Sequence, residues 1–105
     1  MEGLTQGRIV HYVLTEEDAG KINRRRIVSG VVSNPNWPAG AQAHVGNYVE
    51  PGDHYPAIVV MTYTNASHDR GTVNLQVFLD GSDTFWAEVI DFGEEPGTWH
   101  WIEKA

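Results

Sequence analysis

The sequence contains no cysteine, so a disulfide framework and a thiolate metal site are both excluded. Basic residues are also scarce: seven Lys and Arg stand against fourteen Asp and Glu, and the formal net charge is −7. Because nucleic-acid backbones attract cationic surfaces, an acidic chain is not expected to bind nucleic acid in general. Apolar runs such as 57–61 are too short to cross a bilayer, and residues 1–8 lack a signal-peptide pattern. We therefore expect a cytoplasmic protein that does not enter the membrane.

What is present favours one folded domain. The chain has 105 residues, of which 41% are hydrophobic and 20% charged, and this composition is typical of a globular protein. The first seven residues, 1–7, read as a flexible lead-in. Residues 8–105 are expected to form a single β-rich domain.

Six segments carry the β-branched, aromatic or alternating pattern of strands. The only clear helix begins after Thr15, where Thr15-Glu16-Glu17-Asp18 forms a capping sequence, and is expected to end at Arg24 or Arg26. Residues 27–32 fit either a helix or a strand. The fold class is therefore α+β and β-rich, with one helix after the first strand and about six strands in a small barrel or a curved antiparallel sheet. The six strand segments are 8–14, 42–49, 55–64, 72–79, 85–90 and 98–102.

Four stretches of the chain look familiar together: GRIVHYVLTEEDA at 7–19, WPAGAQAHVGN at 37–47, QVFLDG at 76–81 and PGTWHW at 96–101. They resemble a group of small phage and prophage proteins usually described as hypothetical. The resemblance covers most of the chain from Gly7 onward. It implies a viral origin, hence an infected host cell as the location, and a compact single domain. It carries no established activity.

No catalytic or metal-binding motif is evident from spacing. The five histidines lack the helical spacing of a metalloprotease site, so no metal ligand and no cofactor is assigned, although a spatial cluster from different strands stays open. Aspartates lie near turns, where their side chains bond to their own backbone, and no serine stands in a nucleophile elbow. We therefore predict a protein that is not an enzyme. The histidines are His11, His44, His54, His68 and His100.

Two features exceed what composition predicts. Four tryptophans in so short a chain either fill the core or form a stacking platform for a flat ligand. Four of the seven basic residues lie between Lys21 and Arg26, where they either suit the helix C-terminus or grip phosphate oxygens. The candidate ligand-binding residues are Arg24, Arg25, Arg26, Trp37, His44, Asn47, Tyr48, Trp86, Trp99 and Trp101.

These features favour a non-catalytic phage accessory protein that sequesters a nucleotide-type defence signal of the host. A domain this small rarely encloses such a ligand alone, so a homo-oligomer is expected. Three alternatives stay open: an acidic inhibitor or DNA mimic that binds a host protein, a small virion or assembly component, and a hydrolase that uses His and Asp residues at strand ends.

Overall fold

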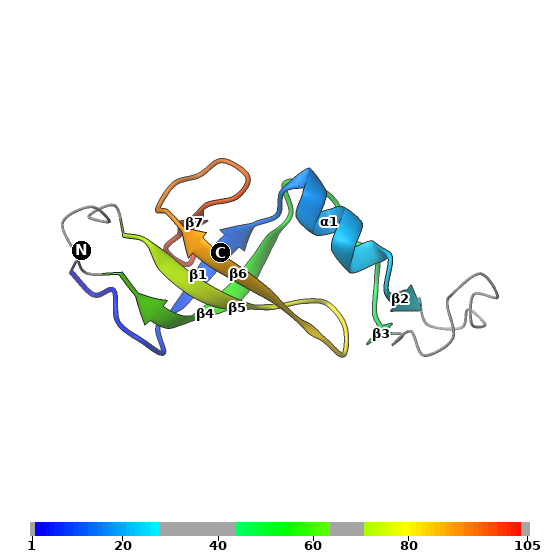
Figure 1. Cartoon of the computed structure of the whole chain (residues 1–105), viewed down its shortest axis with the longest axis horizontal. Coiled ribbons are helices and arrows are strands. Elements are labelled where there is room, and N and C mark those ends of the chain that lie inside the picture. Colours follow the sequence, from blue (N-terminus) through cyan, green and yellow to red (C-terminus); the bar gives the residue numbers. More distant parts are fainter. Residues whose placement is uncertain (1, 28–43, 64–70, 104–105) are drawn as a thin grey trace.

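A computed structural model describes residues 2–27, 44–63 and 71–103, with side chains for all of these except 27, 44 and 45. In chain order the elements are β1 (Ile9–Val13), α1 (Glu16–Asn23), β2 (Arg26–Ile27), β3 (His44–Val45), β4 (His54–Thr62), β5 (Val73–Phe78), β6 (Thr84–Ile90) and β7 (Trp99–His100). Five strands form one antiparallel sheet in the order β6-β5-β4-β1-β7, and β2 pairs with β3 in parallel (Figure 1).

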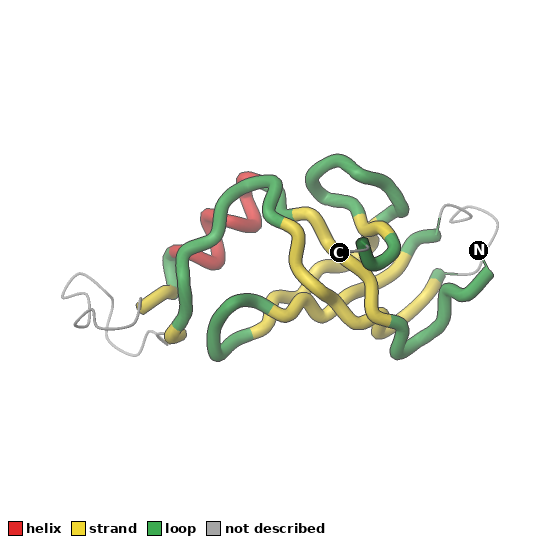
Figure 2. Tube along the Cα trace, turned by 180° about the vertical axis from the view of Figure 1, so that it is seen from behind, coloured by secondary structure: helices red, strands yellow, loops and turns green. Residues whose placement is uncertain are grey.

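The predicted β-rich fold, with one helix after the first strand, is confirmed. The sheet is open rather than closed into a barrel (Figure 2). In the strand order, β6 lies at one edge and β7 at the other. Of the strand expected over 42–49, the described residues 44–49 keep only β3, and the strand expected over 98–102 is reduced to β7. Of the ambiguous segment 27–32, residue 27 belongs to β2 and the rest lies outside the described residues.

Alternation along the strands separates the core from the outer face of the sheet. In β1, Val10 and Tyr12 are buried, whereas His11 between them is only partly buried. In β7, Trp99 is fully buried, with its Nε1 donating to the Gly71 carbonyl at 2.6 Å, and His100 lies on the other face. Each fully buried apolar side chain contributes about 1.5–3 kcal/mol of transfer free energy. The same period of two therefore builds the core and leaves histidines on the opposite face.

The capping sequence predicted at Thr15 is present in both halves. Thr15 Oγ1 accepts a hydrogen bond from the Asp18 amide at 3.0 Å, and Asp18 Oδ2 accepts one from the Thr15 amide at 3.0 Å. The Tyr12 hydroxyl donates to the same Asp18 oxygen at 2.5 Å, so the start of α1 is tied to β1. Burial and the Asp18 carboxylate together raise the pKa of Tyr12 well above its usual range.

Replacing Thr15 by alanine is expected to lower the free energy of unfolding by about 1 kcal/mol, because the Asp18 amide loses its acceptor. Thr15→Ser keeps the hydroxyl and is the matched control. Urea unfolding followed by tryptophan fluorescence measures both. Equal losses in the two variants would contradict the assigned cap.

The helix lies beyond one end of the sheet, beside β2 and β3, and does not cover a sheet face (Figures 1 and 2). Its inner side is short and apolar, with Ala19 and Ile22 buried. Among the described residues, no helix has the length and hydropathy needed to span a membrane.

Candidate functional site

The basic run at the end of α1 is divided between surface and interior. Arg24 and Arg25 are exposed and, with Lys21, line an open surface pocket of about 400 Å³. Arg26 is different: its side chain is fully buried, and its Nη1 donates to Asp83 Oδ1 at 2.6 Å. The structure therefore brings two of the three predicted arginines together and assigns the third to a buried ion pair.

The predicted aromatic residues do not gather around those arginines. Trp99 is a core residue, and Trp101 packs edge-on against it at a centroid distance of 5.0 Å, with the Arg8 guanidinium over the Trp101 ring. Trp86 is exposed on β6, at the edge of the sheet opposite to β7. Trp37 lies outside the described residues.

The other three predicted ligand residues, His44, Asn47 and Tyr48, come after the helix in the sequence. Asn47 donates through Nδ2 to Asp80 Oδ2 at 2.8 Å, a bond that joins its loop to the β5–β6 turn. Tyr48 is well exposed beside it. His44 stands in β3 opposite Arg26, and its side chain lies outside the described set. Of the ten candidates, Arg24 and Arg25 line one pocket together in the described part of the chain.

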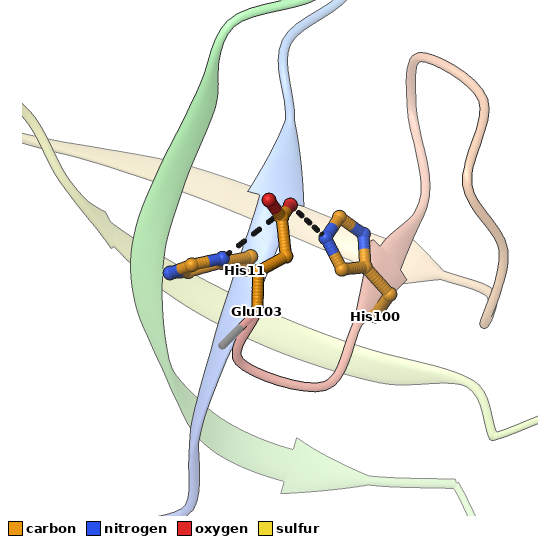
Figure 3. A group of neighbouring side chains, drawn as sticks. All are labelled: His11, His100 and Glu103. Carbon is orange, nitrogen blue, oxygen red and sulfur yellow. Dashed lines mark hydrogen bonds and ion pairs between the residues drawn. The ribbon is translucent and has the colours of Figure 1, made fainter. Parts of the chain in front are cut away.

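A different cluster forms on the outer face of the sheet. His11 of β1 and His100 of β7 are directly opposite each other in the strand register, so their side chains start from neighbouring positions on one face. Glu103 follows β7, and the chain turns back so that its carboxylate lies between the two imidazoles (Figure 3). His54, the first residue of β4, contacts the same carboxylate. We call His11, His54, His100 and Glu103 the histidine cluster.

One oxygen atom, Glu103 Oε1, contacts all three imidazoles of the histidine cluster. Glu103 Oε1 lies 2.5 Å from His100 Nε2 and 3.6 Å from His11 Nδ1, and it also accepts a hydrogen bond from His54 Nδ1. The hydrogen bonds from His100 and His54 hold the pKa of Glu103 down at about 2. The carboxylate is therefore ionised and offers lone pairs to any cation that enters.

The donor atoms fit a transition-metal ion. The ligand atoms of His11, His100 and Glu103 all lie within 4.8 Å of one another. A tetrahedral Zn²⁺ site, with bonds of about 2.0–2.2 Å, holds its donors about 3.3 Å apart. His11 Nδ1 is buried and makes no hydrogen bond within the described part of the chain, its contact with Glu103 Oε1 at 3.6 Å being longer than a hydrogen bond. The 2.5 Å between Glu103 Oε1 and His100 Nε2 is a hydrogen-bond distance, so these two donors would separate on binding an ion.

Spacing along the sequence could not reveal this cluster, because its members come from both ends of the chain and from one middle strand. The available signal was the alternation of side chains along a strand. Val10 and Tyr12 flank His11, and Trp99 and Trp101 flank His100, so each histidine points to the face opposite to its large apolar neighbours. That pattern places each imidazole on an outer face. It does not say that β1 and β7 are neighbours.

Comparisons with protein-family models, curated proteins and solved structures found no match. What the chain binds is therefore inferred from its own side chains.

Proposed function

We propose that the protein binds a divalent transition-metal ion, with Zn²⁺ as the first candidate, through His11, His100 and Glu103. The observation that supports it most is the convergence of these three donor atoms around one point on the outer face of the sheet, with His11 Nδ1 lacking a hydrogen-bond partner among the described residues. Buried polar atoms normally make hydrogen bonds, so a nitrogen that only lies near a carboxylate has a lone pair or proton to spare for a further partner.

The type of donor selects the class of metal. Imidazole nitrogen suits Zn²⁺, Cu²⁺, Ni²⁺ and Fe²⁺, whereas Mg²⁺ and Ca²⁺ prefer sites made only of oxygen. Two imidazoles and one carboxylate form a recurrent zinc ligand set. The ion would join β1 to the segment after β7, since His11 belongs to the first and Glu103 to the second. The proposed function is thus metal binding that fastens the Glu103 segment to the sheet.

Titration with Co²⁺, followed by visible absorption and calorimetry, tests this proposal. The wild-type protein is expected to bind one ion, and His100→Ala and Glu103→Gln are each expected to weaken binding more than about 100-fold, because even loss of an outer-shell partner weakens metal sites about 10- to 100-fold. Glu88→Gln is the matched control: it removes the same charge from an exposed residue of β6, at the opposite edge of the sheet. Equal affinity in all four proteins would refute the site.

A second candidate function is the sequestration of a phosphorylated, nucleotide-type ligand by a phage accessory protein. The pocket lined by Lys21, Arg24 and Arg25 favours it, because guanidinium groups bind phosphate oxygens in pairs. Its volume is at the lower end of the range for small-molecule sites. Association of several copies would add further arginines, in line with the expected homo-oligomer.

Mass spectrometry of ligand released from the purified protein, together with thermal shifts against a panel of cyclic nucleotides, tests the second function. Arg24→Gln/Arg25→Gln is expected to abolish any shift. Arg8→Gln is the control, since Arg8 lies over Trp101, away from α1. The absence of released ligand and of any shift in the wild-type protein would reject this function without affecting the metal site.

A further inference from the structure

We infer that His54 is the fourth protein ligand of the metal ion, and that the site completed in this way is structural and closed to added ligands. The inference rests on the proposed metal binding and defines what the ion does there. Structural zinc sites hold four protein ligands, whereas catalytic zinc sites hold three and keep the fourth position for water or substrate. The number of protein ligands therefore decides between the two roles.

The printed geometry of the cluster places His54 nearer to its centre than His11, which is one of the three proposed ligands. The His54 ring centroid lies 5.0 Å from that of His100, whereas the His11 centroid lies 5.8 Å from it. His54 Nδ1 makes a hydrogen bond to Glu103 Oε1, whereas His11 Nδ1 is 3.6 Å from the same oxygen. A set of ligands that includes His11 therefore has reason to include His54.

The strand register explains how His54 reaches the cluster from a third strand. His54 is directly opposite Val13 on β1, two residues from His11, so His54 and His11 are diagonal neighbours on one face of the sheet. Diagonal neighbours are separated by about 7–8 Å, which is within reach of aromatic and long side chains. This wider spacing agrees with the place of His54 outside the three donors that lie within 4.8 Å of one another.

The three imidazoles surround one atom, Glu103 Oε1. His54 and His100 make hydrogen bonds to it, and His11 contacts it from the remaining strand. Three imidazole nitrogens around one point are also the ligand set of a zinc ion bound by three histidines. Glu103 lies after β7 and outside any strand, and its side chain is 49% exposed, so it has the freedom to move aside and bind the ion next to the imidazoles.

His54 is the most exposed of the three imidazoles. Its side chain is 40% exposed, against 22% for His11 and 13% for His100. As a ligand, His54 would stand between the ion and water and would fill the last position of a tetrahedral site. The ion would then join β1, β4, β7 and the segment after β7, so its role is to hold the sheet and that segment together.

Cobalt-loaded protein provides the test, because the visible bands of Co²⁺ report a change in its ligands. His54→Ala is expected to weaken Co²⁺ binding more than about 100-fold, which exceeds the loss of about 10- to 100-fold for a residue that only positions a ligand. At saturating Co²⁺ its spectrum should differ from that of the wild-type protein, because water replaces the imidazole. His54→Gln, which can still donate a hydrogen bond to Glu103, should behave like His54→Ala.

Added imidazole tests whether a coordination position is vacant. Below the concentration that removes Co²⁺ from the wild-type protein, imidazole should restore the wild-type bands in His54→Ala. Neither imidazole nor acetate should change the wild-type spectrum, because four protein ligands leave no position free. Glu88→Gln is the control again and should match the wild-type protein in every measurement.

Three results would overturn the inference while leaving metal binding intact. A loss of less than about 100-fold in His54→Ala, or an unchanged spectrum at saturation, would mean that His54 only positions Glu103. Wild-type affinity in His54→Gln would mean the same. A wild-type spectrum that responds to imidazole or acetate would show an open position. Failure of the wild-type protein to bind Co²⁺ at all would instead reject the proposed function and this inference together.

Discussion

Zinc ion at 100 times its dissociation constant is expected to raise the midpoint temperature of unfolding by about 10 °C or more. A ligand at that concentration that binds only the folded state contributes about 2.7 kcal/mol, and in a domain of about 100 residues each kcal/mol shifts the midpoint by about 4 °C or more. The increase should disappear when a chelator is added. Differential scanning fluorimetry with and without the chelator measures it.

His100→Ala separates site binding from nonspecific effects of the metal. This variant keeps Glu103 and His54 but lacks one of the three donors within 4.8 Å. With binding weakened about 100-fold or more, Zn²⁺ at the same concentration should raise its midpoint temperature by no more than about 3 °C. A shift in His100→Ala as large as that of the wild-type protein would mean that the ion acts elsewhere on the chain.

Asp83→Ala is expected to lower the free energy of unfolding by about 3–5 kcal/mol, because it leaves the Arg26 guanidinium buried without its counter-charge. The Arg26 side chain is fully buried and that of Asp83 is 11% exposed, so the guanidinium left behind is largely shielded from water. Two other guanidinium nitrogens, Nε and Nη2, already lack partners within the described residues. Urea denaturation followed by circular dichroism measures the loss.

Glu17→Ala is the matched control for the buried pair. Glu17 and Lys21 form an ion pair across one turn of α1 at 3.2 Å, with both side chains largely in solvent. Removing such a pair changes stability by about 0.5 kcal/mol or less. The double variant Arg26→Met/Asp83→Leu removes both charges and should recover most of what Asp83→Ala loses. If Asp83→Ala were no worse than Glu17→Ala, the pair would contribute nothing to folding.

The local parts of the fold followed from the sequence. The cap at Thr15 predicted where α1 begins, and the strand segments expected over 72–79 and 85–90 correspond to β5 and β6. In each case neighbouring residues determine the outcome through their own backbone geometry and hydrogen bonds. Local chemistry is sufficient where structure depends on residues a few positions apart.

Pairings between distant residues could not be predicted. Arg26 follows two exposed arginines and differs from them only because Asp83 meets it in the folded chain. A run of positive charge is normally a solvated surface, and nothing within the run marks its last member as buried. The histidine cluster could not be predicted for the same reason, because the contact between His11 and His100 depends on which strands become neighbours in the sheet.

The strand order also governs when the fold can form. Among the described strands, β1 is the first to be synthesised and β7 the last, yet β1 lies between β4 and β7 in the sheet. Its hydrogen bonds therefore wait for segments made much later, and such non-local pairing slows folding because loop-closure entropy is lost before the contacts form. On the ribosome, β1 stays without either neighbour until β4 emerges, and His11 cannot meet Glu103 until translation has passed that residue. The proposed metal site can therefore form only after the segment that carries Glu103 has been made.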